Sequence, residues 1–299
     1  IGSVIDVVGD RAVEGKLVTK SFCGGHQYTT WFRIEFDRPF KAHGTWGEEG
    51  GLPGARHSME GEAKPNGAWL SFDLADGRSV TATSAISHVD AEGARNNLRS
   101  DGMQGGKLLS FDRMRALSQA QWREQLGSVK VEGASADDRT VLYTALYHAL
   151  LQPMTGSDAD GRYRGYDDVI HRADGWTYYE YFSLWDTYRT QNQWLALTRP
   201  EVARDIGRSM LAINEQGGWL PRWGYANFET NVMTGDPVTP FMVDLWRFGA
   251  LKGREAEAWG ALRRNAFEMP PINSRMAGRS GNASYLANGY VAYDRAFPS

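Results

Sequence analysis

Residues Thr177–Arg189 read TYYEYFSLWDTYR, and the interpretation of the whole chain depends on this stretch. We predict that it forms a helix that continues to about Leu197. In a helix, residues three and four positions apart are neighbours, so Trp185, Asp186 and Arg189 are expected near one face. The spacing of Asp186 and Arg189 predicts that the two side chains steady each other beside an indole ring.

A charge pair beside an indole ring has two interpretations. An apolar platform with fixed hydrogen-bonding groups is typical of a site for a polyhydroxylated ligand. A buried ion pair that only fixes helix packing would leave the same pattern, and this stretch alone favours neither. The chain contains 11 Trp residues, however, and its aromatic content is 12%. Stacking of sugar C–H faces on indole rings accounts for this abundance better than a large aromatic core does.

The composition limits the classes of protein to which this chain can belong. A chain of 299 residues is long for one domain and comfortable for two. Its net charge is −3, without a run of Lys or Arg, which disfavours nucleic-acid binding. No apolar stretch approaches the roughly 20 residues of a membrane span. Cys23 is the single cysteine, so an intrachain disulfide and a multi-cysteine zinc site are excluded.

Residues 1–90 are predicted to form strands. In Trp31–Phe36, apolar and charged residues alternate, which is typical of a half-buried antiparallel strand. Ala68–Leu74 and Ser79–Ser87 are predicted strands joined by a hairpin turn at Ala75–Arg78. The pattern indicates a β-sandwich or part of one. So few strands would leave exposed edges, so we expect further strands outside this sequence.

From about residue 90 the apolar pattern becomes helical. Residues 91–130 are predicted to be a helical linker, and residues 131–299 to be helical hairpins arranged around a cavity, about half of an α/α toroid. Asp158–Gly161 reads DADG, the opening of a calcium loop, but it lacks the spaced glutamate, so a turn is favoured. The predicted helices span Ala91–Leu98, Phe111–Leu126, a segment after Ser135, Pro200–Glu215, Val238–Leu251 and Arg254–Phe267, and the tail from Asn282 onward has no clear element.

Five motifs in order resemble glycoside hydrolase family 92, the calcium-dependent exo-α-mannosidases. Ser87–Leu98 is also similar to the family's junction between its sandwich and its barrel. The motifs are Leu142–His148, Ser157–Gly165, Phe182–Arg189, Leu220–Trp223 and Met233–Pro237.

The resemblance implies an α+β multidomain fold, in which a partial β-sandwich is followed by a partial (α/α)6 barrel. It implies a glycoside hydrolase that removes terminal mannose from α-mannosides and N-glycans with inversion. The resemblance also implies calcium as the cofactor, gripping the sugar hydroxyls, and a secreted or periplasmic location.

The resemblance implies substrate-binding roles for several side chains. Asp186 would accept a hydrogen bond from a hydroxyl of the terminal mannose, and Arg189 would orient Asp186 or bind a hydroxyl. Trp185 and Trp223 would be platforms or cleft walls. Three weaker candidates could equally well have a structural role instead of a substrate-binding one: Arg222, Glu229 and Asp236.

The chain also departs from the family. Family members are roughly twice this length, and their general acid, their general base and most calcium ligands are expected after the point where this sequence stops. We therefore expect the middle part of an enzyme, without acid and base, with the remaining segments as its partner. The alternatives are a non-catalytic carbohydrate-binding protein and another (α/α)6 hydrolase of the trehalase or glucoamylase type.

Overall fold

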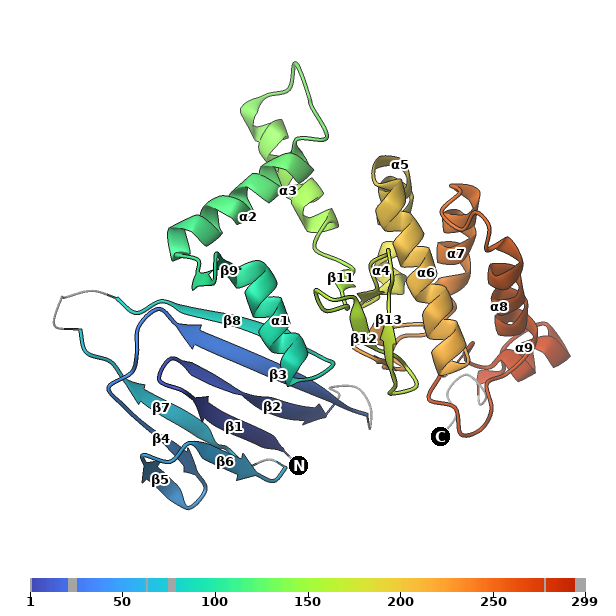
Figure 1. The fold of residues 1–299 in the computed structure, drawn as a ribbon. Helices are drawn as coiled ribbons and strands as arrows, with labels where there is room; N and C mark the ends of the chain where they lie inside the picture. The colour runs from blue at the N-terminus through green and yellow to red at the C-terminus, as the bar shows by residue number, and fades with distance from the viewer. Residues whose placement is uncertain (1, 21–25, 63, 75–78, 277, 294–299) are drawn as a thin grey trace. The chain divides into compact units, whose positions relative to one another are not determined.

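The computed structural model describes residues 2–20, 26–62, 64–74, 79–276 and 278–293. They form two compact units, one built mainly from residues 2–148 and one mainly from residues 149–293 (Figure 1). Cys23 and the predicted turn at residues 75–78 lie outside the described residues. None of the helices in the described ranges combines the length and the apolar character that a bilayer crossing requires.

The first unit contains a five-stranded antiparallel sheet in the order β6-β1-β2-β3-β8. The register of β2 against β3 places Gly15 opposite Phe32 and Val13 opposite Ile34. The strands are β1 (Ser3–Val8), β2 (Ala12–Lys20), β3 (Gln27–Phe36), β6 (His57–Glu60) and β8 (Ala82–Ser87).

A second sheet of three strands packs on this one. Its order is β5 (Gly50–Pro53), β4 (Ala42–Gly47) and β7 (Gly67–Ser71). The buried cluster between the sheets contains side chains from both: Ile5, Val7, Val13, Phe32, Phe36, Phe40, Ala68, Leu70 and Phe72. The alternation predicted for β3 is therefore confirmed. The two sheets pack face to face, as in a β-sandwich.

The predicted hairpin between the last two strands of this region is wrong. β7 pairs with β4, whereas β8 pairs with β3, so the two strands lie in different sheets. Each strand pairs with a strand that lies far away in the sequence. Local turn propensity therefore misidentified the pairing, although both strands were located.

Helix α1 (Ala91–Gly102) covers the opposite face of the larger sheet (Figure 1). The carboxylate of Asp90 accepts the N–H of Gly93 at 2.7 Å and caps this helix. Glu14 on β2 accepts hydrogen bonds from Arg33 at 2.8 Å and from both Nε and Nη2 of Arg95 on α1, at 2.9 and 2.6 Å. These bonds join helix and sheet through charged groups, and together they hold the pKa of Glu14 below its ordinary value.

Two further predicted helices are present in the first unit. α2 (Phe111–Leu126) follows the cap Ser110, and α3 (Ala136–Ala149) follows Ser135, whose hydroxyl accepts the N–H of Asp138 at 3.1 Å. Neither helix buries a described residue, and Val141 is 70% exposed. The described residues therefore leave both helices exposed or only half-buried.

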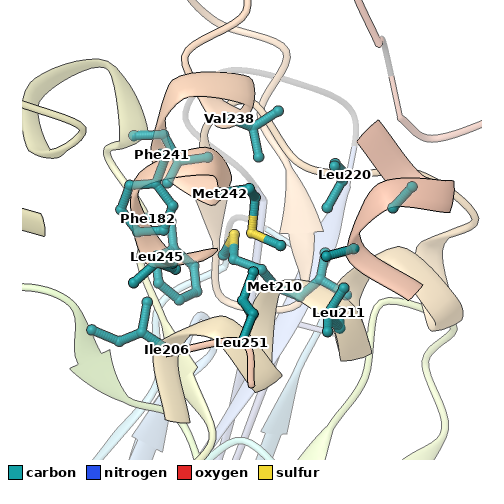
Figure 2. Close-up of a cluster of buried hydrophobic side chains, with 14 of the residues drawn as sticks. Phe182, Ile206, Met210, Leu211, Leu220, Val238, Phe241, Met242, Leu245 and Leu251 are labelled. Atoms are coloured by element: carbon teal, nitrogen blue, oxygen red, sulfur yellow. The ribbon is translucent and has the colours of Figure 1, made fainter. Parts of the chain in front are cut away.

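The second unit is organised around α6 (Pro200–Gly217), α7 (Val238–Arg247) and α8 (Glu255–Phe267), which pack side by side (Figure 1). Pro200 begins α6, as the sequence predicts, and Gly218, with a φ of 80°, ends it. Figure 2 shows Met210 of α6 and Met242 of α7 pointing toward one another in the core that these helices share. α9 (Asn282–Asn288), in the tail, was not predicted.

The remaining elements are short. α4 (Leu184–Thr187) and α5 (Gln191–Thr198) precede α6. The two-stranded hairpins and pairs are β9 (Met103–Gln104) with β10 (Lys107–Leu108), β11 (Met154–Thr155) with β14 (Tyr179–Glu180), β12 (Arg162–Arg164) with β13 (Ile170–Arg172), and β15 (Gly224–Tyr225) with β16 (Phe228–Glu229).

The single helix predicted from Thr177 to about Leu197 is wrong over its first half. Residues 177–183 contain no helix: Tyr179–Glu180 form β14, and Phe182 forms an isolated bridge to Gly224. Tyr178, Glu180 and Phe182 are buried while the residues between them are half-buried. This period of two belongs to a strand, and aromatic residues prefer strands over helices. The backbone hydrogen bonds of this segment instead join residues far away in sequence: the N–H of Gly156 donates to the carbonyl of Tyr178 at 2.7 Å, and the N–H of Phe182 donates to the carbonyl of Gly224 at 2.9 Å.

Candidate functional site

The candidate site begins where two extended segments meet. The N–H of Phe182 donates to the carbonyl of Gly224 at 2.9 Å, which places Ser183 beside Trp223. The indole N–H of Trp223 donates to the hydroxyl of Ser183 at 2.8 Å. That hydroxyl in turn donates to Oδ2 of Asp186. Two of the predicted site residues, Trp223 and Asp186, are thus connected through a serine that the sequence analysis did not select.

Asp186 presents an exposed carboxylate at this site. Within the described part of the chain, Oδ1 of Asp186 receives no hydrogen bond and the carboxylate forms no ion pair. The expected pairing of Asp186 with Arg189 is wrong because α4 ends at Thr187, before Arg189. Arg189 instead donates to the hydroxyl of Tyr188 at 3.1 Å, with its guanidinium 5.4 Å from that ring's centre.

Trp185 stands next to Asp186 on α4 and is 49% exposed. Its indole N–H donates to the carbonyl of Thr234 at 3.1 Å. The edge of the ring is therefore fixed by the protein, while about half of its surface remains open to a ligand. This contact also connects α4 with the segment that leads into α7.

Glu229 lies inside this region and is 2% exposed. Its carboxylate accepts the backbone N–H groups of Arg222, of Trp223 at 3.1 and 3.2 Å, and of Asn231 at 2.9 Å. Burial raises the pKa of Glu229 above its ordinary value, and these backbone bonds oppose the rise. Because its oxygens are occupied by the backbone, Glu229 shapes the loop that carries Trp223 and does not face a ligand.

Arg222 is also buried, at 6% exposure. Its guanidinium donates to the hydroxyl of Ser280 at 2.7 Å and to the carbonyl of Asn231 at 3.1 Å. Burial lowers the pKa of Arg222, while the charges of Glu229 and Asp236 act in the opposite direction. Arg222 therefore connects the Trp223 loop to the tail of the chain.

Asp236 stands at the start of α7. It accepts hydrogen bonds from the hydroxyl of Thr239 at 2.7 Å and from the amide of Asn265 at 3.0 Å, and it lies 3.3 Å from Nε of Arg279. All these partners are protein groups. Asp236 thus anchors the beginning of α7 to α8 and to the tail.

The calcium-loop motif is used for packing in the first unit. Oδ2 of Asp158 accepts the hydroxyl of Ser87 at 2.7 Å, and Oδ1 accepts the amide of Asn97 at 2.8 Å. Across the described ranges, no three His, Cys, Asp or Glu side chains gather into a set that could hold a metal ion. The described residues therefore offer no carboxylate cluster of this kind for calcium.

The seven predicted residues thus differ in their exposure and in their contacts. Asp186 and Trp185 are open to solvent, and Trp223 is half-buried at the same place. Arg222, Glu229 and Asp236 make protein contacts that hold the surrounding loops. Arg189 lies with Tyr188, away from the carboxylate it was expected to orient. An acceptor carboxylate, a half-exposed ring and a rigid support can together bind a hydroxyl-rich ligand.

Two family models match the chain. The family model for the glycosyl hydrolase family 92 catalytic domain matches residues 93–298, and that for the family's N-terminal domain matches residues 1–87. A search of curated proteins found no match.

Solved structures of the same family are similar as well. The family GH92 α-mannosidase BT3965 from Bacteroides thetaiotaomicron has a TM-score of 0.83 at 29% identity, over 98% of this chain and 38% of that chain. A second structure of BT3965, in complex with mannoimidazole, has a TM-score of 0.82 at 29% identity, over 98% and 37% of the two chains.

Two other proteins extend the comparison. The family GH92 inverting mannosidase BT2199 from Bacteroides thetaiotaomicron VPI-5482 has a TM-score of 0.86 at 24% identity, over 98% of this chain and 39% of that one, which supports the fold alone. The gh92 family glycosyl hydrolase ccman5 has a TM-score of 0.73 at 27% identity, over 97% and 37% of the two chains.

This chain spans less than two fifths of the length of each of these proteins. The two family matches nevertheless cover nearly every residue, in the order in which the two domains occur along the sequence. The motif around Asp186 lies within the matched catalytic domain. The chain belongs to glycosyl hydrolase family 92.

Proposed function

We propose that the protein containing this chain hydrolyses terminal α-mannosides, including those of N-glycans, with inversion at the anomeric carbon. The family membership supports a glycoside hydrolase and disfavours the trehalase-like and glucoamylase-like alternatives. BT3965, which is similar at 29% identity, is described as an α-mannosidase and was solved with mannoimidazole. A mannose-containing glycan is accordingly the proposed substrate.

One observation carries the proposal for this chain. The exposed carboxylate of Asp186 and the half-exposed ring of Trp185 are adjacent, and the protein holds one edge of each. An ionised carboxylate only accepts hydrogen bonds, which suits the hydroxyls of a sugar. An indole face is an apolar surface on which the C–H face of a pyranose can stack. The pair would bind the terminal mannose, and Trp223 would form the neighbouring wall.

In an inverting glycosidase, one carboxylic acid protonates the leaving oxygen and one carboxylate activates water, at a separation of roughly 6.5–9.5 Å. We assign neither role to a residue of this chain. Glu229 is unsuited to both, because its oxygens are occupied by buried backbone N–H groups. The proposed task of this chain is therefore to bind and orient the sugar.

Three further properties are proposed on the family resemblance. The helical unit would belong to an (α/α)6 barrel, and the enzyme would act outside the cytoplasm, as a secreted or periplasmic protein. Calcium would supply electrostatic stabilisation and orientation at the sugar hydroxyls.

The test is an assay of the protein in its natural length with p-nitrophenyl α-D-mannopyranoside, with the α-D-glucopyranoside as the control. We expect release from the mannoside only, loss of release with EDTA, and recovery with added calcium. Proton NMR during early turnover should show the β anomer of mannose first. Mannoside binding without release would instead identify a carbohydrate-binding protein, and activity unaffected by EDTA would contradict the calcium proposal.

A further inference from the structure

The hydroxyl of Ser183 lies between the two groups of the candidate site that come from different loops. It contacts the indole N–H of Trp223 at 2.8 Å and a carboxylate oxygen of Asp186. An indole N–H can only donate and an ionised carboxylate can only accept. The directions are therefore fixed: the hydroxyl accepts from Trp223 and donates to Asp186. One small group thus satisfies both partners at once.

The backbone holds this hydroxyl in place. The carbonyl of Ser183 accepts the N–H groups of Asp186 at 3.0 Å and Thr187 at 3.1 Å, and also the hydroxyl of Thr187 at 3.0 Å. Its neighbours in sequence, Phe182 and Leu184, are 2% and 0% exposed. A side chain that is flanked by two buried residues and stands at the start of a helical turn has little freedom to move. Ser183 is therefore a rigid support for both partners.

We propose that Ser183 is the positioning residue that fixes the Asp186 carboxylate relative to the Trp223 ring, an inference that rests on the proposed mannoside-binding function of this site. With Oδ2 held by the serine hydroxyl, Oδ1 is presented toward the ligand in one orientation. Without the hydroxyl, the exposed Asp186 side chain would sample several rotamers, and ordering it on binding would cost affinity. Ser183 itself does not contact the sugar; it acts through Asp186 and Trp223.

Residue chemistry defines the informative variants. Ser183→Ala removes the group that donates to Asp186 and accepts from the indole N–H of Trp223. Ser183→Thr retains a hydroxyl on the same carbon and is the conservative rescue. Asp186→Ala removes the group through which the serine is proposed to act. Ser118→Ala, at an exposed position of α2, is the matched control for a serine-to-alanine change.

The experiment measures the Kd of methyl α-D-mannopyranoside by isothermal titration calorimetry for the natural-length protein and these variants. We expect Ser183→Ala to raise Kd about tenfold, since a lost hydrogen bond to a charged group and a newly mobile side chain act together. Ser183→Thr and Ser118→Ala should bind like wild type. Added to Asp186→Ala, Ser183→Ala should weaken binding no further, whereas damage to the fold alone would remain additive.

A second readout does not depend on the ligand. The indole Nε1–H resonance of Trp223, assigned by its loss in Trp223→Phe, should shift in Ser183→Ala and also in Asp186→Asn, because the carboxylate acts on the indole through the hydroxyl. The resonance should be retained in Ser118→Ala. A Trp223 resonance that is unchanged in Ser183→Ala would overturn the hydrogen-bonded connection itself.

The outcomes separate this inference from the proposed function. If wild type binds the mannoside and Asp186→Ala weakens binding while Ser183→Ala does not, the positioning role is overturned and mannoside binding stands. If wild type neither binds nor hydrolyses the mannoside, the proposed function fails and the positioning role fails with it. Tenfold weakening with rescue by threonine and no further effect in the Asp186→Ala background supports the inference.

Discussion

Both oxygens of the buried Glu229 carboxylate accept the backbone N–H of Trp223, at 3.1 and 3.2 Å. The same carboxylate also binds the N–H groups of Arg222 and Asn231. A side chain that accepts hydrogen bonds from the backbone N–H groups of three residues determines the path of the loop. The position of the Trp223 ring is thus set by an acid that the sequence could only suggest as a substrate ligand.

Replacement of Glu229 should destabilise the folded protein, because its carboxylate accepts hydrogen bonds from buried backbone N–H groups. Glu229→Ala leaves buried N–H groups without acceptors, at a cost of about 1–3 kcal/mol for each unsatisfied group. Glu229→Gln, which keeps one acceptor oxygen, should cost less than the alanine change. Urea unfolding followed by tryptophan fluorescence measures both. Glu124→Gln, at an exposed position of α2, is the control, and an equal effect at the two sites would contradict this account.

The pH dependence of stability should carry a signature of Glu229. Burial raises its pKa in the folded state, so the folded protein binds a proton more readily than the unfolded chain. Its contribution to the free energy of unfolding should fall as pH rises from the ordinary glutamate pKa to the raised value. The free energy of unfolding of wild type minus that of Glu229→Gln should therefore decrease over this window. An increase would refute the assignment of a raised pKa.

Glu14 should show the opposite pH dependence. The hydrogen bonds from Arg95 and Arg33 lower its pKa in the folded state, against the effect of partial burial. The stabilisation it provides is then present above the ordinary glutamate pKa and is lost as pH falls through the lowered value. The difference in unfolding free energy between wild type and Glu14→Gln should increase with pH. High salt should reduce it only in part, because the side chain is 14% exposed.

Trp185 should contribute to binding mainly through its ring. Trp185→Ala removes the platform and should raise KM for an α-mannoside about tenfold, which corresponds to about 1.4 kcal/mol. Trp185→Phe retains an aromatic face but loses the hydrogen bond to Thr234, so it should raise KM less. Trp259→Ala is the control, since Trp259 on α8 is 63% exposed. Equal KM values for Trp185→Ala and wild type would exclude the platform role.

The core of the second unit should respond as a close-packed interior. Leu245 on α7 is fully buried among α6 and α7 side chains (Figure 2), and Leu245→Ala should cost about 2–5 kcal/mol of unfolding free energy. Met242→Leu nearly conserves volume and should cost less than about 1.5 kcal/mol. Urea unfolding of both variants checks the contrast. A small cost for Leu245→Ala would show that this cluster is loosely packed.

Sequence patterns located most regular elements for local reasons. The alternation in Trp31–Phe36 and the Pro200 start of α6 depend on neighbours in the chain, and both were confirmed. The α9 helix has only seven residues, and its first residue Asn282 donates to the carbonyls of Ala266 and Glu268. Tertiary contacts of this kind have no local signal in the sequence.

The candidate site was only partly predictable. The motif around Trp185 and Asp186 was identified, but its secondary structure was wrong because a run of aromatic residues fits a buried helix and a buried strand equally well. The path of residues 177–183 depends on the pairing of Tyr179 with Thr155 and of Phe182 with Gly224, which lie far away in sequence. For the same reason, the contact between Ser183 and Trp223 could not be foreseen.

The most direct test of the central claim is the kcat/KM for an α-mannoside, compared between the natural-length protein and its Asp186→Ala variant. If the exposed carboxylate binds the terminal mannose, wild type should release mannose and the variant should lose more than tenfold in kcat/KM, about 1.4 kcal/mol or more of transition-state binding. Unfolding curves that coincide for the two proteins would show that the loss arises at the site. Equal kcat/KM values for the two proteins would contradict the claim.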